Sequence, residues 1–123
     1  MKKIFLLLIF LPALCRAQIP ADSAKYYYGQ NVEICGNVLD ANTAIRTSPA
    51  DTTYLVEFEL GTRIDNKRNV VCQVSVRCKA GEYETAELRK KYTNTTISVK
   101  GFVLKGRAIP RIVVNSMSDV RIK

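Results

Sequence analysis

Four segments of this 123-residue chain alternate between apolar and polar side chains at every second position. The positions of the apolar sets are Val32, Ile34 and Val38; Tyr54, Val56, Phe58 and Leu60; Val70, Cys72, Val74 and Val76; and Ile97, Val99 and Val103. A period of two is typical of β-strands that bury one face. A fifth strand is predicted over Ile109–Val114, where Pro110 indicates an edge or the start of a strand. The chain is therefore predicted to be mainly β.

The segments between these strands divide into helices and polar connections. Pro20 to Gly29 is predicted to be a short helix, because proline suits a first turn and glycine suits a stop. Glu82 to Tyr92 is predicted to be a second helix, with acidic residues early and basic residues late, as the helix dipole favours. Asp40 to Thr53 is predicted to be a polar loop, and Gly61 to Asn69 a turn.

Five strands with one helix between the third and the fourth is the element order of an OB-fold. This fold is a small, five-stranded Greek-key barrel, and Gly36 in the first strand suits the bend that such a barrel needs. The expected architecture is a five-stranded OB-fold barrel with a short N-terminal helix and a helix between strands three and four.

Two segments carry a resemblance to a known family. Tyr28–Val38 resembles the opening strand of small OB-fold domains of the tRNA-anticodon-binding type, and Val99–Val114 resembles their closing hairpin. Small secreted bacterial proteins occur among the members of this kind. The chain departs from the pattern at Ala108-Ile109, which lengthen the loop before Pro110. The resemblance implies an OB-fold and, as a possibility for function, the binding of nucleic acid.

The N-terminus has the pattern of a cleavable secretion signal. Lys2 and Lys3 precede an apolar run over residues 4–14, and Cys15-Arg16-Ala17 then places small residues at the positions that a signal peptidase inspects. The run is shorter than the roughly 20 residues needed to span a bilayer. We expect cleavage between Ala17 and Gln18, so that residues 1–17 are the signal, residues 18–123 are the OB-fold domain, and the protein is periplasmic or secreted.

Cys15 raises the alternative of a lipid-modified N-terminus. Lipoprotein signals have a small residue directly before the modified cysteine, whereas Leu14 occupies that position here. The sequence therefore disfavours a lipoprotein. Mass spectrometry of the mature N-terminus distinguishes the two forms.

The charge of the domain is moderately basic. The chain has 19 basic and 11 acidic residues, and three of the basic ones, Lys2, Lys3 and Arg16, belong to the signal. The excess that remains favours anionic partners or surfaces without specifying one.

The cysteines and the composition bear on chemistry. Cys72 shares the phase of the buried positions of its strand and is expected to be a small core residue. An exported domain can form a disulfide, and the candidate pair is Cys35 with Cys78.

The chain has no histidine and no zinc-like cysteine spacing, so no metal or cofactor is predicted. No nucleophile with a recognisable base is present, and the protein is predicted not to be an enzyme.

OB-folds bind ligands across strands two and three and at the loops that flank them. The outward residues expected there include Glu57 and Glu59 but no aromatic residue, which suits a phosphate backbone poorly. The candidate ligand-binding residues are Arg46, Arg63, Lys67, Arg68, Arg77, Phe102, Lys105 and Arg107. Each of the cations is also compatible with an ordinary solvated surface charge. Tyr26-Tyr27-Tyr28 are expected to cap an open end of the barrel.

These features predict an exported, non-enzymatic OB-fold binding module whose ligand is a protein, a saccharide or an anionic polymer. The first alternative is a module that binds single-stranded nucleic acid through its basic loops. Export and the two carboxylates of Glu57 and Glu59 count against this alternative. The second alternative is a structural or assembly subunit that pairs through Cys35 or through an exposed strand edge. Its partners and its oligomeric state are left open by the sequence.

Overall fold

The computed structural model describes residues 18–123, so the predicted signal over residues 1–17 lies outside the described residues. The strands are β1 (Ile19–Pro20), β2 (Asn31–Thr47), β3 (Thr52–Ile64), β4 (Lys67–Cys78), β5 (Thr96–Lys105), β6 (Pro110–Val114) and β7 (Val120–Ile122). The helical segments are the 3₁₀ helices η1 (Ala21–Tyr26) and η2 (Met117–Asp119) and the α-helix α2 (Thr85–Tyr92). No helix within this range is long and apolar enough to cross a membrane.

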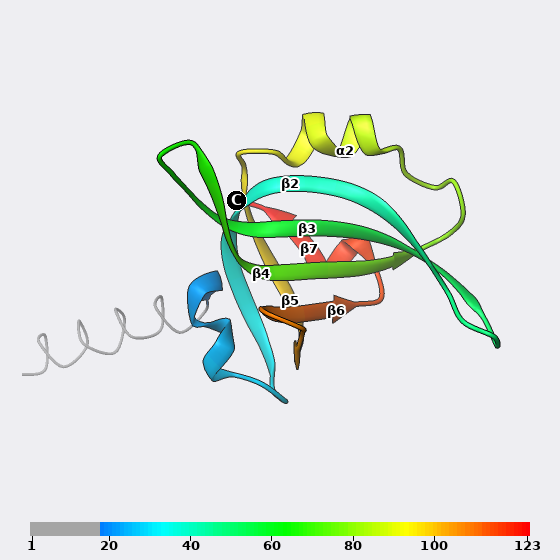
Figure 1. Ribbon diagram of the computed structural model, residues 1–123, viewed down its shortest axis with the longest axis horizontal. Helices are drawn as coiled ribbons and strands as arrows, with labels where there is room; N and C mark the ends of the chain where they lie inside the picture. The colour runs from blue at the N-terminus through cyan, green and yellow to red at the C-terminus, as the bar shows by residue number, and fades with distance from the viewer. Residues whose placement is uncertain (1–17) are drawn as a thin grey trace, which may run out of the picture.

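Five of the strands close into a barrel (Figure 1). β2 pairs with β3 along its second part and with β5 along its first, and β3 pairs with β4. β6 completes the circuit, because it lies parallel to β4 and antiparallel to β5. This closed order, β2-β3-β4-β6-β5, with α2 between β4 and β5, defines an OB-fold. The predicted fold class is confirmed.

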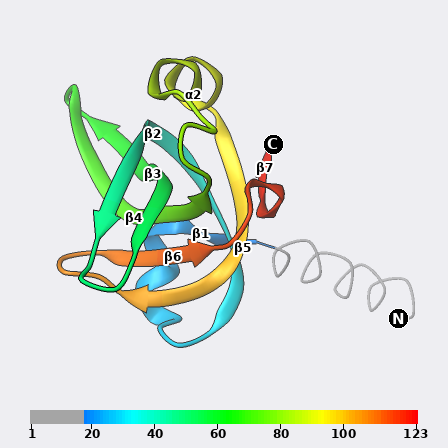
Figure 2. The ribbon, with the colours of Figure 1, turned by 90° about the vertical axis from the view of Figure 1, so that its right-hand side faces the viewer.

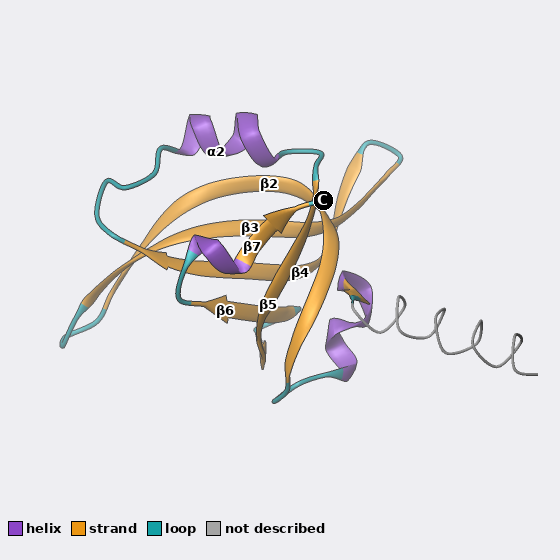
Figure 3. Ribbon diagram, turned by 180° about the vertical axis from the view of Figure 1, so that it is seen from behind, coloured by secondary structure: helices purple, strands orange, loops and turns teal. Residues whose placement is uncertain are grey.

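The two ends of the barrel are closed by helical segments, α2 at one end and η1 at the other (Figure 3). From α2, Leu88 and Tyr92 enter the core, and the ring of Tyr92 meets the ring of Phe58 edge to face at 4.9 Å. From η1, Ala21 and Ala24 enter the core. Gly36 permits this approach, because a Cβ at that position would stand 2.8 Å from the Cβ of Ala21.

The barrel interior consists of the alternating apolar residues that the sequence predicts to face inward. Those with no exposed surface are Ile34, Val38, Val56, Phe58, Leu60, Cys72, Val74, Val76, Ile97, Val99, Val103 and Ile112. Burial of this set provides the main driving force for folding.

The predicted loop over Asp40–Thr53 is wrong, because most of this segment is strand. β2 continues to Thr47 and pairs with β3 from Asp40 opposite Glu59 to Thr47 opposite Thr52. The connection is a turn over residues 48–51, closed by the N–H of Ser48 donating to the carbonyl of Asp51 at 2.8 Å. Arg46 therefore lies on a strand and not in a loop.

The predicted turn over Gly61–Asn69 is also shorter than expected. β3 runs to Ile64 and β4 begins at Lys67, so the turn itself is Asp65-Asn66. Both residues have positive φ, 51° and 63°, which fits the two-residue turns that match the twist of a hairpin. Gly61 lies at a bulge, where a Cβ would clash with the carbonyl oxygen of Asn69.

Candidate binding face of the barrel

The face of the barrel formed by β3, β4 and β6 is the candidate site. The strand registers place Glu57 opposite Ser75, Leu55 opposite Arg77, and Gln73 opposite Arg111. In Figure 1 these strands lie in front of β5, and Figure 2 shows that the β2–β3 turn and the β5–β6 loop project on the same side of the barrel. We call the outward residues Leu55, Glu57, Gln73, Ser75, Arg77 and Arg111, together with Arg46 of β2, the binding face.

Glu57 is at the centre of the binding face. Its side chain points outward, as the alternation predicts, yet the residue is only 8% exposed. Its Oε2 accepts hydrogen bonds from Gln73 Nε2 at 2.9 Å, from Ser75 Oγ at 3.3 Å and from Arg46 Nη2 at 3.4 Å. A carboxylate can be buried when donors of this kind replace the water that it loses. The neighbouring strands therefore hold this carboxylate in place.

Ser75 extends the network to β6. Its side chain is fully buried, and its Oγ accepts a hydrogen bond from Arg111 Nε at 2.9 Å. A continuous chain of contacts thus runs from Arg46 through Glu57 and Ser75 to Arg111, across four strands. Each side chain in it has its orientation set by a neighbour before any ligand arrives. The sequence shows which of these residues face outward, but not that they contact one another.

Arg77 and Arg111 differ from Arg46, the third arginine of the binding face. Among residues 18–123, neither makes an ion pair, whereas Arg46 pairs with Glu57. Arg77 is exposed and lies on β4, one outward position beyond Ser75. The binding face therefore carries two guanidinium groups without a carboxylate partner, on either side of a fixed polar centre.

The outward row of β5 borders the binding face. Leu104 lies opposite Arg111, and Phe102 lies opposite Val113. Both are exposed, Phe102 by 44% and Leu104 by 42%, and Phe102 is outward as predicted. Beyond them, Lys105 ends β5 and Arg107 lies in the four-residue loop to β6. The loop is closed by the N–H of Gly106 donating to the carbonyl of Ile109 at 3.1 Å.

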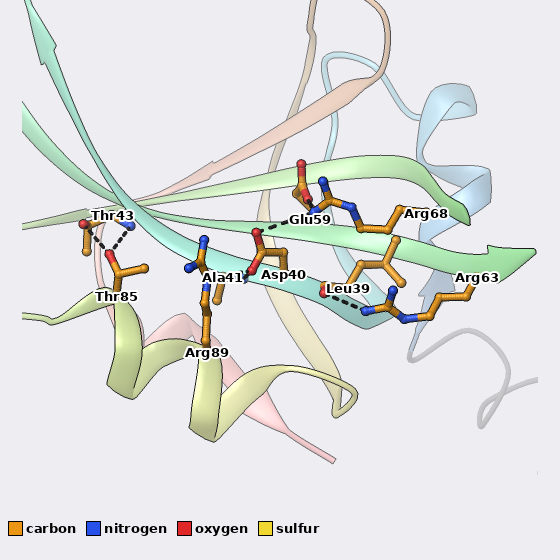
Figure 4. A network of polar contacts seen from close by, with 9 residues as sticks. All are labelled: Leu39, Asp40, Ala41, Thr43, Glu59, Arg63, Arg68, Thr85 and Arg89. Atoms are coloured by element: carbon orange, nitrogen blue, oxygen red, sulfur yellow. Dashed lines mark hydrogen bonds and ion pairs between the residues drawn. The ribbon is translucent and has the colours of Figure 1, made fainter. Parts of the chain in front are cut away.

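The arginines of the β3–β4 hairpin contact groups outside the binding face. Arg68 Nη1 contacts Glu59 at 2.8 Å and Asp40 at 3.6 Å, and Arg89 of α2 reaches Asp40 at 3.0 Å (Figure 4). Arg63 Nη2 donates to the carbonyl oxygen of Leu39 at 3.4 Å. These contacts join the hairpin and α2 to β2 at Leu39 and Asp40, where the register between β2 and β3 shifts.

The structure thus distributes the eight predicted binding residues over three places. Arg46 and Arg77 are on the binding face, and Phe102, Lys105 and Arg107 are on the β5–β6 hairpin beside it. Arg63, Lys67 and Arg68 are on the β3–β4 hairpin. The sequence analysis did not identify Gln73, Ser75 and Arg111 as binding residues. The sequence indicated only that they lie on the outward side of two strands.

The cysteines lie in different environments. Cys72 is fully buried, and burial raises the pKa of its thiol to about 12, so the prediction of a core cysteine is confirmed. Cys35 lies opposite Ser98, and Cys78 ends β4 opposite Tyr54. All three are free thiols in the structure, and the pairing of Cys35 with Cys78 stays a prediction.

A thiol count provides the test of that pairing. In the folded protein, Cys72 is expected to resist alkylation near neutral pH, because its thiol is buried and protonated. After unfolding without reductant, residues 18–123 should show one reactive thiol if Cys35 and Cys78 are joined. Three reactive thiols would exclude the bond.

A surface hollow of about 380 Å³ lies between the end of β4 and η2, and Cys78, Glu82 and Tyr83 are among its lining residues. Burial raises the pKa of both the Cys78 thiol and the Tyr83 hydroxyl, and the nearby Glu82 carboxylate raises them further by a smaller amount. A thiol with a raised pKa stays protonated and is a weak nucleophile. Within residues 18–123, no group of three or more histidine, cysteine, aspartate or glutamate residues is placed to hold a metal ion.

The three consecutive tyrosines do not act together. Tyr27 packs against the core, whereas Tyr26 is 72% exposed and Tyr28 is 40% exposed. Only the middle ring fulfils the expectation that these residues cap an end of the barrel.

No protein-family model and no curated protein matches the chain. Among solved structures, the OB domain of a Thermoplasma acidophilum protein is similar, with 12% identity, a TM-score of 0.49, and coverage of 86% of this chain and 84% of that chain. A protein named as an aspartyl-tRNA synthetase from Leishmania major is similar at 13% identity and a TM-score of 0.48; the match covers 87% of this chain and 20% of that one. The assignment to the OB-fold class rests on the strand order described above.

Proposed function

We propose that the protein is a non-enzymatic binding module and that its ligand presents an anionic group to the binding face. The observation that carries this proposal is the pair Arg77 and Arg111, which flank the fixed Glu57–Ser75 centre without carboxylate partners of their own. Guanidinium groups recognise carboxylate, phosphate and sulfate through paired N–H donors.

The charges around the binding face support an anionic ligand. Glu57 and Arg46 neutralise one another, so they add no net charge. Lys105 and Arg107 stand at the bordering hairpin, and residues 96–115 contain no acidic residue. A sulfated or carboxylated saccharide suits this chemistry, because its hydroxyls can also hydrogen-bond to the partly exposed amide of Gln73.

The proposal includes export. The pattern of Met1 to Ala17 supports export, with residues 18–123 as the mature protein outside the cytoplasm. A fusion of residues 1–17 to a reporter enzyme that is active only outside the cytoplasm tests this part separately.

Single-stranded nucleic acid is the second candidate ligand. The observation that favours it is the exposed ring of Phe102 next to Arg111 and near Lys105, because stacking rings with cations are how OB-folds hold single strands. Glu57 and Glu59 on β3 count against it, since they lie on the face over which a phosphate backbone would run.

The binding test uses residues 18–123, which contain the whole barrel and its core. The probes are a fluorescent heparin-derived hexasaccharide, a neutral maltohexaose and a fifteen-nucleotide oligo-dT, followed by anisotropy. We expect binding of the sulfated probe, and the double variant Arg77→Ala/Arg111→Ala should weaken it by about tenfold or more, the value of at least one charged hydrogen bond.

A matched double variant, Lys67→Ala/Arg121→Ala, removes the same charge at sites away from the binding face. It should change the affinity for the hexasaccharide by less than about threefold, because salt screens surface charges that lie away from the site. Equal losses in the two double variants would contradict the proposed site. Tighter binding of oligo-dT than of the hexasaccharide, with the same dependence on Arg77 and Arg111, would select the second candidate.

A further inference from the structure

Four large apolar or aromatic side chains are exposed near the end of the barrel that η1 closes. They are Tyr26, 72% exposed, Tyr28, 40%, Phe102, 44%, and Leu104, 42%. In residues 18–123 only three others of this size are exposed, and they lie elsewhere: Ile45 and Ile64 at the two hairpins and Ile122 in β7. We call the four residues the η1–β5 patch.

Backbone hydrogen bonds bring the two halves of this patch together. The N–H of Gly29 donates to the carbonyl of Val103 at 2.8 Å, and the N–H of Val103 donates to the carbonyl of Gln30 at 2.9 Å. The segment between η1 and β2 therefore runs beside the end of β5, as Figures 1 and 2 both show. Tyr28 directly precedes this contact, and Phe102 and Leu104 flank it on β5.

Cations surround the patch. Lys25 lies with its Nζ 5.3 Å from the centre of the Tyr26 ring. Lys105 follows Leu104 directly in the chain, and Arg107 comes two residues later. The segment over residues 96–115, which forms β5 and β6, has four basic residues and no acidic one. A partner that binds the patch must therefore present both an apolar layer and negative charge.

We propose that the η1–β5 patch docks the protein on the surface of a lipid bilayer that contains anionic phospholipids. Tyrosine, phenylalanine and leucine side chains settle at the boundary between headgroups and acyl chains, and neighbouring lysines and arginines attract anionic headgroups. The charge complementarity selects this occupant. The exposed aliphatic Leu104 favours a lipid surface over a nucleic-acid strand, whose bases stack on aromatic rings.

The patch borders the binding face, because Leu104 of β5 lies opposite Arg111 of β6. Arg77, Glu57 and Ser75 lie on β3 and β4, outside the η1–β5 patch. The two proposals are tested with different probes, vesicles for the patch and the sulfated hexasaccharide for the binding face, so their failures can be told apart.

The test is sedimentation with large unilamellar vesicles, either of phosphatidylcholine alone or of three parts phosphatidylcholine to one part phosphatidylglycerol. Residues 18–123 should sediment with the anionic vesicles, and less so as salt is raised. The variant Phe102→Ser/Leu104→Ser should lower the partition coefficient by about tenfold or more, because two apolar side chains are lost from the interface. Lys105→Glu/Arg107→Glu should lower it by about fivefold or more for each cation removed.

Two control variants match these changes at the hairpins. Ile45→Ser/Ile64→Ser removes exposed apolar groups outside the patch, and Lys67→Glu reverses a charge there; both should leave the partition coefficient within twofold of that of the parent. Circular dichroism confirms that each variant keeps the barrel.

Four results would overturn the proposal. The first is no sedimentation with anionic vesicles at low salt. The second is an equal loss in the control variants. The third is a concentration-dependent dimer in vesicle-free solution that Phe102→Ser/Leu104→Ser abolishes, because the patch would then be an interface between two copies of the chain. The fourth is displacement of the protein from vesicles by oligo-dT, with the same dependence on Phe102, which would reassign the patch to nucleic acid.

Discussion

Replacing Phe58 with alanine is expected to lower the free energy of unfolding by about 3–5 kcal/mol, the usual loss for a large buried aromatic side chain. Phe58 has no exposed surface and lies on β3, the strand that carries the centre of the binding face on its other side. Its ring meets Tyr92 edge to face at 4.9 Å, so it also joins the barrel wall to α2. Its removal leaves a cavity where these two elements meet.

Urea unfolding followed by circular dichroism measures this loss, and the matched control is Phe102→Ala. Phe102 is the same residue type on the outer side of the barrel, 44% exposed, and its truncation should change stability by less than about 1 kcal/mol. Similar losses for the two variants would mean that Phe58 does not hold the core. They would also mean that Phe102 has a structural role, which would remove it from the η1–β5 patch.

The core could be predicted because its signal is local. Val56, Phe58 and Leu60 are at alternate positions of one segment, and strand geometry alone sends them to one side. The same reasoning identified Cys72 as a buried residue before its environment was known. The order of the strands and the single helix then left an OB-fold as the simplest barrel.

The length of β2 could not be predicted in the same way. Asp40 and Asn42 are poor strand formers in isolation, so their segment is predicted to be a loop. They are in a strand because β3 pairs with them and because α2 protects the open edge, where the N–H of Thr43 donates to Thr85 Oγ1 at 3.3 Å. Both partners are distant in sequence, so no local pattern reveals them.

The binding face shows the same limit at the level of side chains. Alternation indicated that Glu57 faces outward and suggested a solvated charge. The structure buries it because Gln73 and Ser75, on the next strand, donate to its carboxylate. Arg111 enters the site through the parallel pairing of β4 with β6, a contact between segments that the chain order alone does not bring together.

Glu57→Ala distinguishes a prearranged site from a merely basic surface. Loss of the carboxylate leaves Gln73 Nε2, Ser75 Oγ and Arg46 without their shared acceptor, and the free energy of unfolding should fall by about 1–3 kcal/mol. The affinity for the sulfated hexasaccharide should fall as well. Ser75 is the group that orients Arg111, and its own position depends on Glu57.

If only net charge matters, removing a negative group should strengthen the binding of an anion. The expected fall in the affinity of Glu57→Ala is the opposite result. Glu59→Ala provides the control, since Glu59 is a partly exposed carboxylate of the same strand that pairs with Arg68. Its loss should cost less than about 1 kcal/mol of stability and should leave the affinity unchanged or slightly raised. Tighter binding of the hexasaccharide by both variants would show that the anion responds to net charge, and the fixed centre around Glu57 would then have no part in recognition.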